Sequence, residues 1–286
     1  MFKFAVIGAL TENTQDLLRA ISVLGHSGVV LKLTDIVFET RKKDFVAKCG
    51  DYDFDNFDII IFRGYNEHIY EAKLLAEMLV RKNKTIIEQT LAGSYVRGKM
   101  QQAERILQAG INHPATFQAN NLESWQKILD KMSFPIIAKP VFGRKGRGIQ
   151  KLNNSQEALE FFKFNFSDYL AQQYFPIKND FRVLIVGNKV VGGFQRFINE
   201  GQYKSNIYGT KAKKIKINEE MKEIAIKATE AMNYELAGVD LFQYDGKFYV
   251  IEVNVSPQWE KFKFVTGINP ARDIIEYAIA KHLGKK

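Results

Sequence analysis

A lysine at the end of an apolar run, followed by a basic glycine-rich segment, gives the strongest chemical signal in the sequence. Lys139 follows the run FPIIA, and the residues after it read PVFGRKGRG. Glycines let backbone N–H groups close over phosphate oxygens, and basic side chains balance phosphate charge. The segment lacks the P-loop order GxxxxGK[ST], and taken alone it could equally be a surface turn. The candidate phosphate-binding residues are Lys139, Gly143, Arg144, Lys145, Gly146, Arg147 and Gly148.

Three oxygen-bearing side chains further along the chain could bind a hard metal ion. Asp240 lies in one expected strand, and Glu252 and Asn254 lie in the next. Side chains two residues apart in a strand point to the same face. Mg²⁺ prefers carboxylate and amide oxygens and usually shares its coordination shell with nucleotide phosphates. The alternative is a hairpin end that faces solvent. The apolar run FYVIEVNV disfavours it, because acidic groups among apolar residues need a partner.

Between these two signals lies a set of polar and aromatic residues suited to holding a nucleotide. Residues 172–175 read QQYF and are expected to form an extended connection whose backbone could read an adenine edge. Asp180 could accept hydrogen bonds from ribose hydroxyls. Arg182 and Arg196, in consecutive expected strands, could stabilise the charge of a transferring phosphoryl group. Each residue taken singly could instead form a surface ion pair, but the set favours a nucleotide site.

The first part of the chain is expected to form a parallel α/β layer. Apolar runs alternate with helical patterns, and the run FDIIIF at 57–62 is typical of a strand buried on both faces. Gly8 stands alone after the first strand, so a glycine-rich dinucleotide fingerprint is missing there. The expected strands cover 2–7, 29–33, 57–62 and 85–87, and the apolar helix faces are Leu17, Leu18, Ile21 and Leu24, then Ala72, Leu75, Ala76 and Leu79.

The rest of the chain alternates strand pairs with helices, as expected of α+β lobes. Gly187-Asn188 and Asp245-Gly246 are hairpin-type turns between apolar runs. The expected helices cover 99–109, 122–132, 156–164, 219–232 and 271–282, and the expected strands cover 134–140, 181–186, 189–194, 239–244 and 248–253.

Composition bounds the class of protein without selecting its function. The chain has 286 residues, of which 46% are hydrophobic and 26% charged, which is ordinary for a folded soluble protein. Its formal net charge of +9 favours anionic partners. Cys49 is the single cysteine, and neither a signal peptide nor a bilayer-spanning run is recognised. We therefore expect a cytoplasmic protein without a membrane partner. The four histidines show no metal-ligand spacing and are expected to be structural or exposed.

Several motifs in one order give the sequence a resemblance to the ATP-grasp superfamily. Within it, the chain resembles the RimK-like α-glutamate ligases over residues 99–275. The first part resembles the α/β domain that precedes them, with Arg63-Gly64 in a matching place. The resemblance implies an ATP-grasp fold: a Rossmann-like domain over 1–92, a lobe with the glycine-rich loop over 93–174, and a lobe with the metal and substrate site over 175–286. The motifs are Lys99, FPIIAKPVFGRKGRG, QQYF, Asp180-Phe-Arg182, Arg196, YKSN, GVDLF and IEVNVSPQWEKFKFVTGINPA.

The resemblance also implies a role for each candidate residue. Lys99 and Lys139 would bind the α- and β-phosphates of ATP, covered by the loop from Gly143 to Gly148, and Asp180 would hold the ribose. Two Mg²⁺ ions, with Mn²⁺ as the alternative metal, would be bound by the carboxylate and amide set, Glu252 bridging them. By role, adenine would be held by Gln173, Tyr174 and Phe175, the metal by Asp240, Glu252 and Asn254, the reacting groups by Arg182, Arg196 and Asn206, and the substrate by Lys204 and Ser256.

The sequence departs from the family pattern at three places, and the identity of the substrate is therefore not determined. Gly98 stands where an aspartate usually precedes the first lysine. The family's FRSN is YKSN at 203–206, so that Lys204 supplies a point charge in place of a bidentate arginine. The family's SPG is Ser256-Pro257-Gln258. The last two departures fall where the family holds its acceptor or carboxylate substrate.

The implied function is the ATP-dependent joining of a carboxylate to an amine through an acyl phosphate. Glutamate would be the added amino acid, and an acidic protein, peptide or coenzyme would be the acceptor. The alternatives are a ligase for another amino acid or small molecule and a non-catalytic ATP-binding regulator, which the intact metal set disfavours. Nucleic acid is disfavoured as a partner, because no binding motif is recognised. The sequence does not distinguish a monomer from a homo-oligomer or give the number of residues added.

Overall fold

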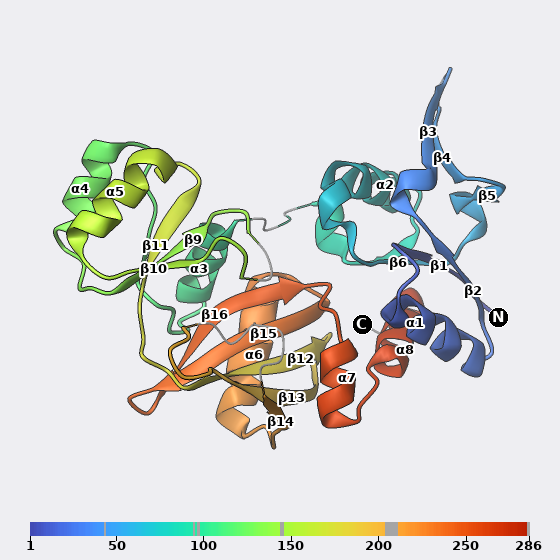
Figure 1. Cartoon of the computed structure of the whole chain (residues 1–286). Helices are drawn as coiled ribbons and strands as arrows, with labels where there is room; N and C mark the ends of the chain where they lie inside the picture. Colours follow the sequence, from blue (N-terminus) through green and yellow to red (C-terminus); the bar gives the residue numbers. More distant parts are fainter. Residues whose placement is uncertain (43, 94, 96–97, 144–145, 204–210, 285–286) are drawn as a thin grey trace.

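Three lobes surround the middle of the molecule in the structure, a computed structural model (Figure 1). The structure describes residues 1–42, 44–93, 95, 98–143, 146–203 and 211–284. A domain built on a parallel sheet lies on one side, a small sheet with two helices lies on the other, and a five-stranded sheet lies below both.

The N-terminal domain is built on a four-stranded parallel sheet in the order β2-β1-β6-β7, which confirms the expected α/β layer. Its inner strand β6 is buried along its whole length, as the row of isoleucines predicts. The first helix begins after Thr11, whose side chain accepts a hydrogen bond from the Thr14 backbone N–H. The strands are β1 (Lys3–Ile7), β2 (Ser27–Leu31), β6 (Ile59–Phe62) and β7 (Thr85–Ile87), and the helices are α1 (Glu12–Val23) and α2 (Ile69–Arg81).

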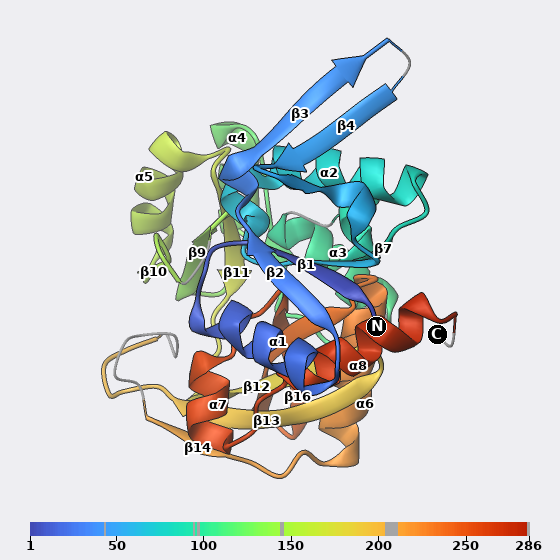
Figure 2. The same cartoon turned by 90° about the vertical axis from the view of Figure 1, so that its right-hand side faces the viewer.

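A hairpin that the sequence analysis missed projects from this domain (Figures 1 and 2). Residues 36–49 read IVFETRKKDFVAKC, so charge is dense and the usual Gly or Asn turn signal is missing. The hairpin and its short third strand form the sheet β3-β4-β5. Its strands are β3 (Ile36–Arg41), β4 (Asp44–Cys49) and β5 (Tyr52–Asp53). The first 92 residues also contain the 3-10 helices η1 (Leu33–Asp35), η2 (Phe54–Asn56), η3 (Tyr65–His68) and η4 (Gln89–Ala92).

The small lobe is an antiparallel sheet in the order β10-β9-β11-β8, with two helices packed together beside it. Trp125 and Phe162, one from each helix, stack with their ring centroids 3.8 Å apart and form the centre of its core. This core holds the strand that carries Lys139. The elements are β8 (Thr116–Phe117), α4 (Leu122–Leu129), β9 (Ile136–Pro140), β10 (Gln150–Leu152), α5 (Ser155–Asn165) and β11 (Tyr169–Gln173).

The third lobe is an antiparallel sheet in the order β14-β13-β12-β15-β16. Apolar residues of one face, such as Val183 and Val239, pack against α6 and α3. Because side chains alternate, Asp180 and Arg182 point to the other face. The strands are β12 (Asn179–Val186), β13 (Lys189–Phe197), β14 (Ala212–Lys214), β15 (Leu236–Tyr244) and β16 (Lys247–Val255), and the helices are α3 (Lys99–Gln108) and α6 (Glu219–Ala231).

The last two helices, α7 (Glu260–Thr266) and α8 (Ala271–His282), connect this lobe with the N-terminal domain. Helix α8 packs against α1 and β7, far from it in the sequence (Figure 2). Its Lys281 donates to Glu235, which also accepts from the backbone N–H groups of Glu88 and Gln89. The domain boundaries at 92/93 and 174/175 stay predictions. In the described parts of the chain, we find no helix whose length and apolar character would let it cross a bilayer.

Candidate nucleotide and metal site

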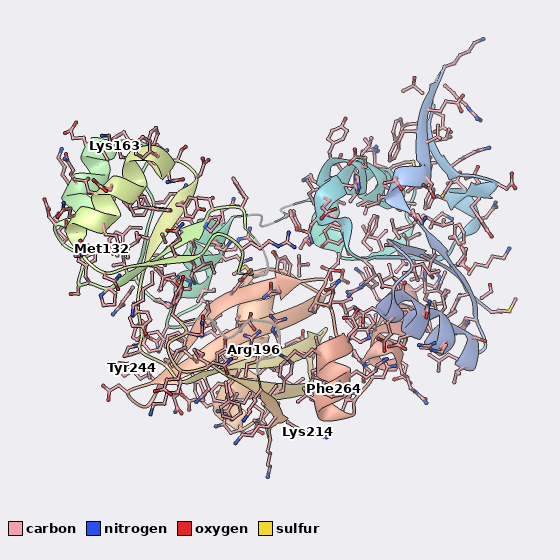
Figure 3. All side chains as sticks on the ribbon, in the orientation of Figure 1. Met132, Lys163, Arg196, Lys214, Tyr244 and Phe264 are labelled. Carbon is pink, nitrogen blue, oxygen red and sulfur yellow. The ribbon has the colours of Figure 1, made fainter. Side chains whose placement is uncertain are left out.

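A cleft between the small sheet and the five-stranded sheet brings most of the predicted site residues together. Its walls come from β9 and β11 on one side and from β13, β15 and β16 on the other. Figure 3 shows Arg196 over the five-stranded sheet, toward the middle of the molecule. The predicted residues that line this cleft are Lys99, Lys139, Gly143, Gly146, Arg147, Gln173, Tyr174, Phe175, Asp180, Arg196, Asp240 and Glu252.

Two lysine ammonium groups lie beside the glycine-rich loop. Lys99 Nζ donates to the carbonyl oxygens of Pro140 and Gly143, each at 2.9 Å, and so ties the first turn of α3 to the loop. Lys139 Nζ donates to Gln172 Oε1. Burial lowers the pKa of Lys139 to about 8, and the attraction of Glu252 only partly opposes this shift. This end of the cleft is therefore cationic at neutral pH, as phosphate binding requires.

The glycines of the loop are needed where the chain folds over Pro140. A Cβ at Gly143 would lie 2.9 Å from Pro140 Cβ, and a Cβ at Gly148 would lie 2.9 Å from both Pro140 Cγ and Tyr169 Oη. Gly148 also has φ of +73°, which L side chains rarely adopt. The loop can therefore keep this path only with glycine at both positions. Arg144 and Lys145 lie outside the described residues.

The other end of the cleft is apolar and aromatic. Gln173 ends β11, and its backbone N–H donates to the Ala115 carbonyl at 2.8 Å, so this segment is held in an extended form. Phe175 packs into a cluster of aromatic rings on β15 and β16, with centroid distances of 5.1 Å to Phe242 and 5.0 Å to Tyr249. Tyr174 lies under the ammonium of Lys151, 4.5 Å from its ring centroid.

A buried network of arginines and carboxylates forms the floor of the cleft. Arg196 donates to both oxygens of Asp180, at 2.7 and 2.8 Å, and to Asp240 Oδ1 at 2.8 Å. Arg182 grips Asp240 from the other side, through Nε and, at 2.7 Å, through Nη2. Burial alone would raise the pKa of Asp240, but Arg182 and Arg196 outweigh it and hold the pKa below its usual value. Asp240 is therefore an anion held by two cations.

The predicted metal ligands lie side by side on β15 and β16. Asp240 pairs in register with Glu252, and Asn254 Nδ2 lies 3.2 Å from Asp240 Oδ2. The described residues contain no group of three or more His, Cys, Asp or Glu that could hold a metal ion. Two carboxylates and one amide nevertheless fit Mg²⁺, because all three supply hard oxygen atoms and the rest of the shell can come from phosphates and water. A metal ion would have to compete with the arginines for Asp240.

Four predicted residues differ from the others in their contacts or their place. Asp180 lines the cleft, but both of its oxygens accept from Arg196, so the contact observed is with an arginine and the ribose role stays a prediction. Ser256 is buried next to the end of β16 and does not line the cleft. Lys204 and Asn206 lie outside the described residues; Tyr203, just before them, lines the cleft and donates to the Ile149 carbonyl at 3.2 Å.

Two residues of this cleft have side-chain roles that were not predicted from the sequence. Gln172 binds Lys139 and also donates to Thr116 Oγ1 at 2.9 Å. His113, expected to be structural or exposed, lines the cleft, and burial lowers its pKa to about 4, so it is neutral at physiological pH. Alternation along β11 could have indicated Gln172, whereas nothing in the local pattern of the segment INHPATF distinguishes His113.

Comparison with solved structures identifies the class of fold. The chain is similar to the ATP-grasp ligase PsnB complexed with a minimal precursor, with a TM-score of 0.76 and 16% sequence identity over 98% of both chains. The chain therefore has the ATP-grasp fold, which confirms the fold expected from its motifs.

The sequence then identifies the family. The model of the RimK-like ATP-grasp domain matches residues 96–278, more than half of the chain. The chain belongs to this family, as the order of its motifs predicts. Two relatives are a "Probable alpha-L-glutamate ligase" of Haemophilus influenzae and a "Coenzyme gamma-F420-2:alpha-L-glutamate ligase" of Methanococcus maripaludis, each 32% identical, over 187 and 179 residues. These matches cover 63% and 59% of this chain and 62% of each relative, less than two thirds of the relatives' length.

Proposed function

We propose that this chain is an ATP-dependent carboxylate–amine ligase that adds glutamate to a protein, peptide or coenzyme acceptor. One observation carries the proposal: a lysine at a glycine-rich loop, Lys139, and two carboxylates, Asp240 and Glu252, line one cleft between two antiparallel sheets. The family and the names of the two relatives support it.

The chain's own residues would act mainly by positioning and by charge. Lys99 and Lys139 would hold the phosphates under the loop, and the aromatic end of the cleft would take adenine. Asp240, Glu252 and Asn254 would hold Mg²⁺, which neutralises phosphate charge when bound. Arg182 and Arg196, which donate to Asp240, would help to neutralise the charge of the phosphates.

The reaction would run in two steps. An oxygen of the substrate carboxylate attacks the γ-phosphorus of ATP and ADP leaves, which gives an acyl phosphate. The amine of the second substrate then attacks the acyl carbon, phosphate leaves, and the nitrogen loses a proton. The enzyme itself forms no covalent bond in this sequence, so its catalytic residues would be those that hold charge in place, Arg182, Arg196 and Asn206.

The substrate assignment rests on the relatives and on charge. Both relatives are named as glutamate ligases, and PsnB is described in complex with a precursor. A net charge of +9 and the predicted substrate residue Lys204 suit an acidic acceptor. Lys204→Glu should therefore raise the KM for the acceptor far more than the KM for ATP, a prediction that steady-state kinetics would check.

Glu252→Gln tests the metal assignment. We expect turnover at saturating Mg²⁺ to fall by about two orders of magnitude or more, because a carboxylate that would hold the metal becomes a neutral amide. Glu223→Gln, on the exposed face of α6, is the matched control and should keep wild-type turnover. Circular dichroism and the melting temperature would show that both variants fold. Wild-type turnover in Glu252→Gln would rule out the proposed metal site.

A further inference from the structure

A second group of buried polar atoms lies outside the nucleotide cleft, where the N-terminal domain meets the five-stranded lobe. Arg63 directly follows β6, at the carboxyl edge of the parallel sheet, where α/β folds commonly bind ligands. Ser256 and Pro257 follow β16, the strand that carries Glu252 and Asn254. Arg63 Nη2 donates to the Pro257 carbonyl oxygen at 2.6 Å and so joins these two places.

Arg63 is a buried cation that contacts a carbonyl oxygen and an aromatic ring. It is 4% exposed and stacks 4.5 Å from the centroid of the Trp259 ring. Among the described residues, no carboxylate forms a salt bridge with Arg63, and its Nη1 has no hydrogen-bond partner. By contrast, the buried Arg196 and the half-buried Arg182 are both paired with carboxylates. Leaving a buried guanidinium unpaired is costly, so this position is one where an anion from outside the chain would be stabilising.

Ser256, the residue before the Pro257 that accepts from Arg63, supplies a second unused donor. It is 8% exposed, and its Oγ has no hydrogen-bond partner among the residues that the structure describes. Its φ of +49° holds the chain in a left-handed conformation between the metal strand and Pro257. A buried hydroxyl normally finds a partner, and a missing one calls for a ligand or a water molecule.

Burial lowers the pKa of Arg63 to about 10, so the guanidinium stays charged at neutral pH. Of the carboxyl groups that attract it, Glu88 contributes more than Glu260. Burial, and after it Glu235, raises the pKa of Glu88 well above its usual value. The raised pKa favours the neutral form of Glu88 and so weakens its attraction for Arg63.

We propose that Arg63 Nη1 and Ser256 Oγ together bind the α-carboxylate of the amino acid whose amine is joined to the acyl group. A guanidinium fork and a hydroxyl are the donors that proteins use for carboxylates. Recognition of the α-carboxylate serves any amino acid, whatever its side chain. Ser256 follows the metal strand by one residue, so an amino acid bound here would lie next to the metal ligands. This inference rests on the proposed ligase function and deepens it.

Calorimetry with protein saturated with Mg²⁺ and a non-hydrolysable ATP analogue tests the subsite. Wild type is titrated with each of the twenty amino acids, L-glutamate first, and then with L-isoglutamine, in which the α-carboxylate of glutamate is an amide. Arg63→Met and Ser256→Ala should each weaken amino-acid binding at least tenfold and change affinity for the nucleotide analogue less than twofold. L-Isoglutamine should bind at least tenfold more weakly than L-glutamate.

Thr90→Val is the matched control. Thr90 Oγ1 is another buried hydroxyl without a partner among the described residues, and it belongs to η4, away from Ser256 in the sequence. This variant should bind the amino acid like wild type. Wild-type affinity in both Arg63→Met and Ser256→Ala, equal binding of L-isoglutamine, or a wild type that binds none of the twenty amino acids would overturn the subsite. Failure of the ligase function would appear separately, as absence of ADP release with every substrate while the nucleotide still binds.

Discussion

The lowered pKa of Lys139 makes nucleotide affinity depend on pH in a defined direction. Lys139 has a pKa of about 8 in the free protein, because burial disfavours its charged form. A lysine that binds phosphate does so as a cation, so the nucleotide should bind the protonated form and raise this pKa. The affinity should therefore be nearly constant below pH ~8 and should fall as the pH rises above it.

The size of the effect follows from the fraction of charged Lys139. With a pKa of about 8, that fraction falls on the order of tenfold between pH 7 and 9, which corresponds to about 1.4 kcal/mol of binding free energy. At pH ~8.5, binding should also take up about three quarters of a proton, because most of the free protein is then neutral at this position. The terminal phosphate ionises near pH ~6 and contributes little to the change in this range.

Calorimetry with Mg²⁺ and a non-hydrolysable ATP analogue measures the affinity at each pH and the proton uptake on binding. The proton uptake is obtained by comparing buffers of different ionisation enthalpy. Lys139→Arg is the control, because a guanidinium stays charged throughout this range and its affinity should vary less than twofold with pH. A wild-type affinity that changes less than twofold between pH ~7 and ~9, with no proton uptake, would refute the assignment of Lys139 to the phosphate site.

Two further predictions concern the floor and the cover of the cleft. Arg196→Met should lower the free energy of unfolding by about 3–5 kcal/mol, because it removes the buried guanidinium that binds both Asp180 and Asp240. Urea unfolding at pH 7 measures this change, and a loss below ~1 kcal/mol would contradict the network. Gly148→Ala should weaken nucleotide binding at least tenfold, because a Cβ there would lie 2.9 Å from two other residues. Gly201→Ala is its control, with a similar φ of +74° and no atom within 4 Å of its Cβ; equal effects of the two would show that steric crowding at the loop is unimportant.

Much of the fold could be predicted from the sequence because its signals are local. The isoleucine row of β6, the two hairpin turns and the apolar face of α8 each lie within one short segment. The hairpin β3-β4 was missed because its charge density hides the alternation of apolar residues. Helix α7 was missed because it spans only seven residues and begins directly after a loop motif.

The sequence could predict which residues share the candidate cleft, but not which side chains bind each other there. Residue types and motif order predicted that Lys139, Asp240 and Glu252 share one site, and all three line the same cleft. They could not show that Arg196 would bind Asp240 and a second carboxylate, because this depends on strand register across a sheet. The contact of Arg63 with Pro257 joins residues 194 positions apart, and no local pattern indicates it.

The measurement that tests the central claim most directly is the release of ADP by the wild-type protein. The protein is incubated with ATP, Mg²⁺ and a panel of amino acids and acidic acceptors, and mass spectrometry gives the mass of the product. We predict ADP release that requires both a carboxylate and an amine substrate, equimolar with a product that is heavier by one or more glutamyl residues. If a product forms with a neutral or basic amino acid and not with glutamate, the glutamate assignment is wrong and the ligase function stands. If the protein binds ATP but no combination releases ADP, the ligase function is wrong, and the chain is an ATP-binding regulator.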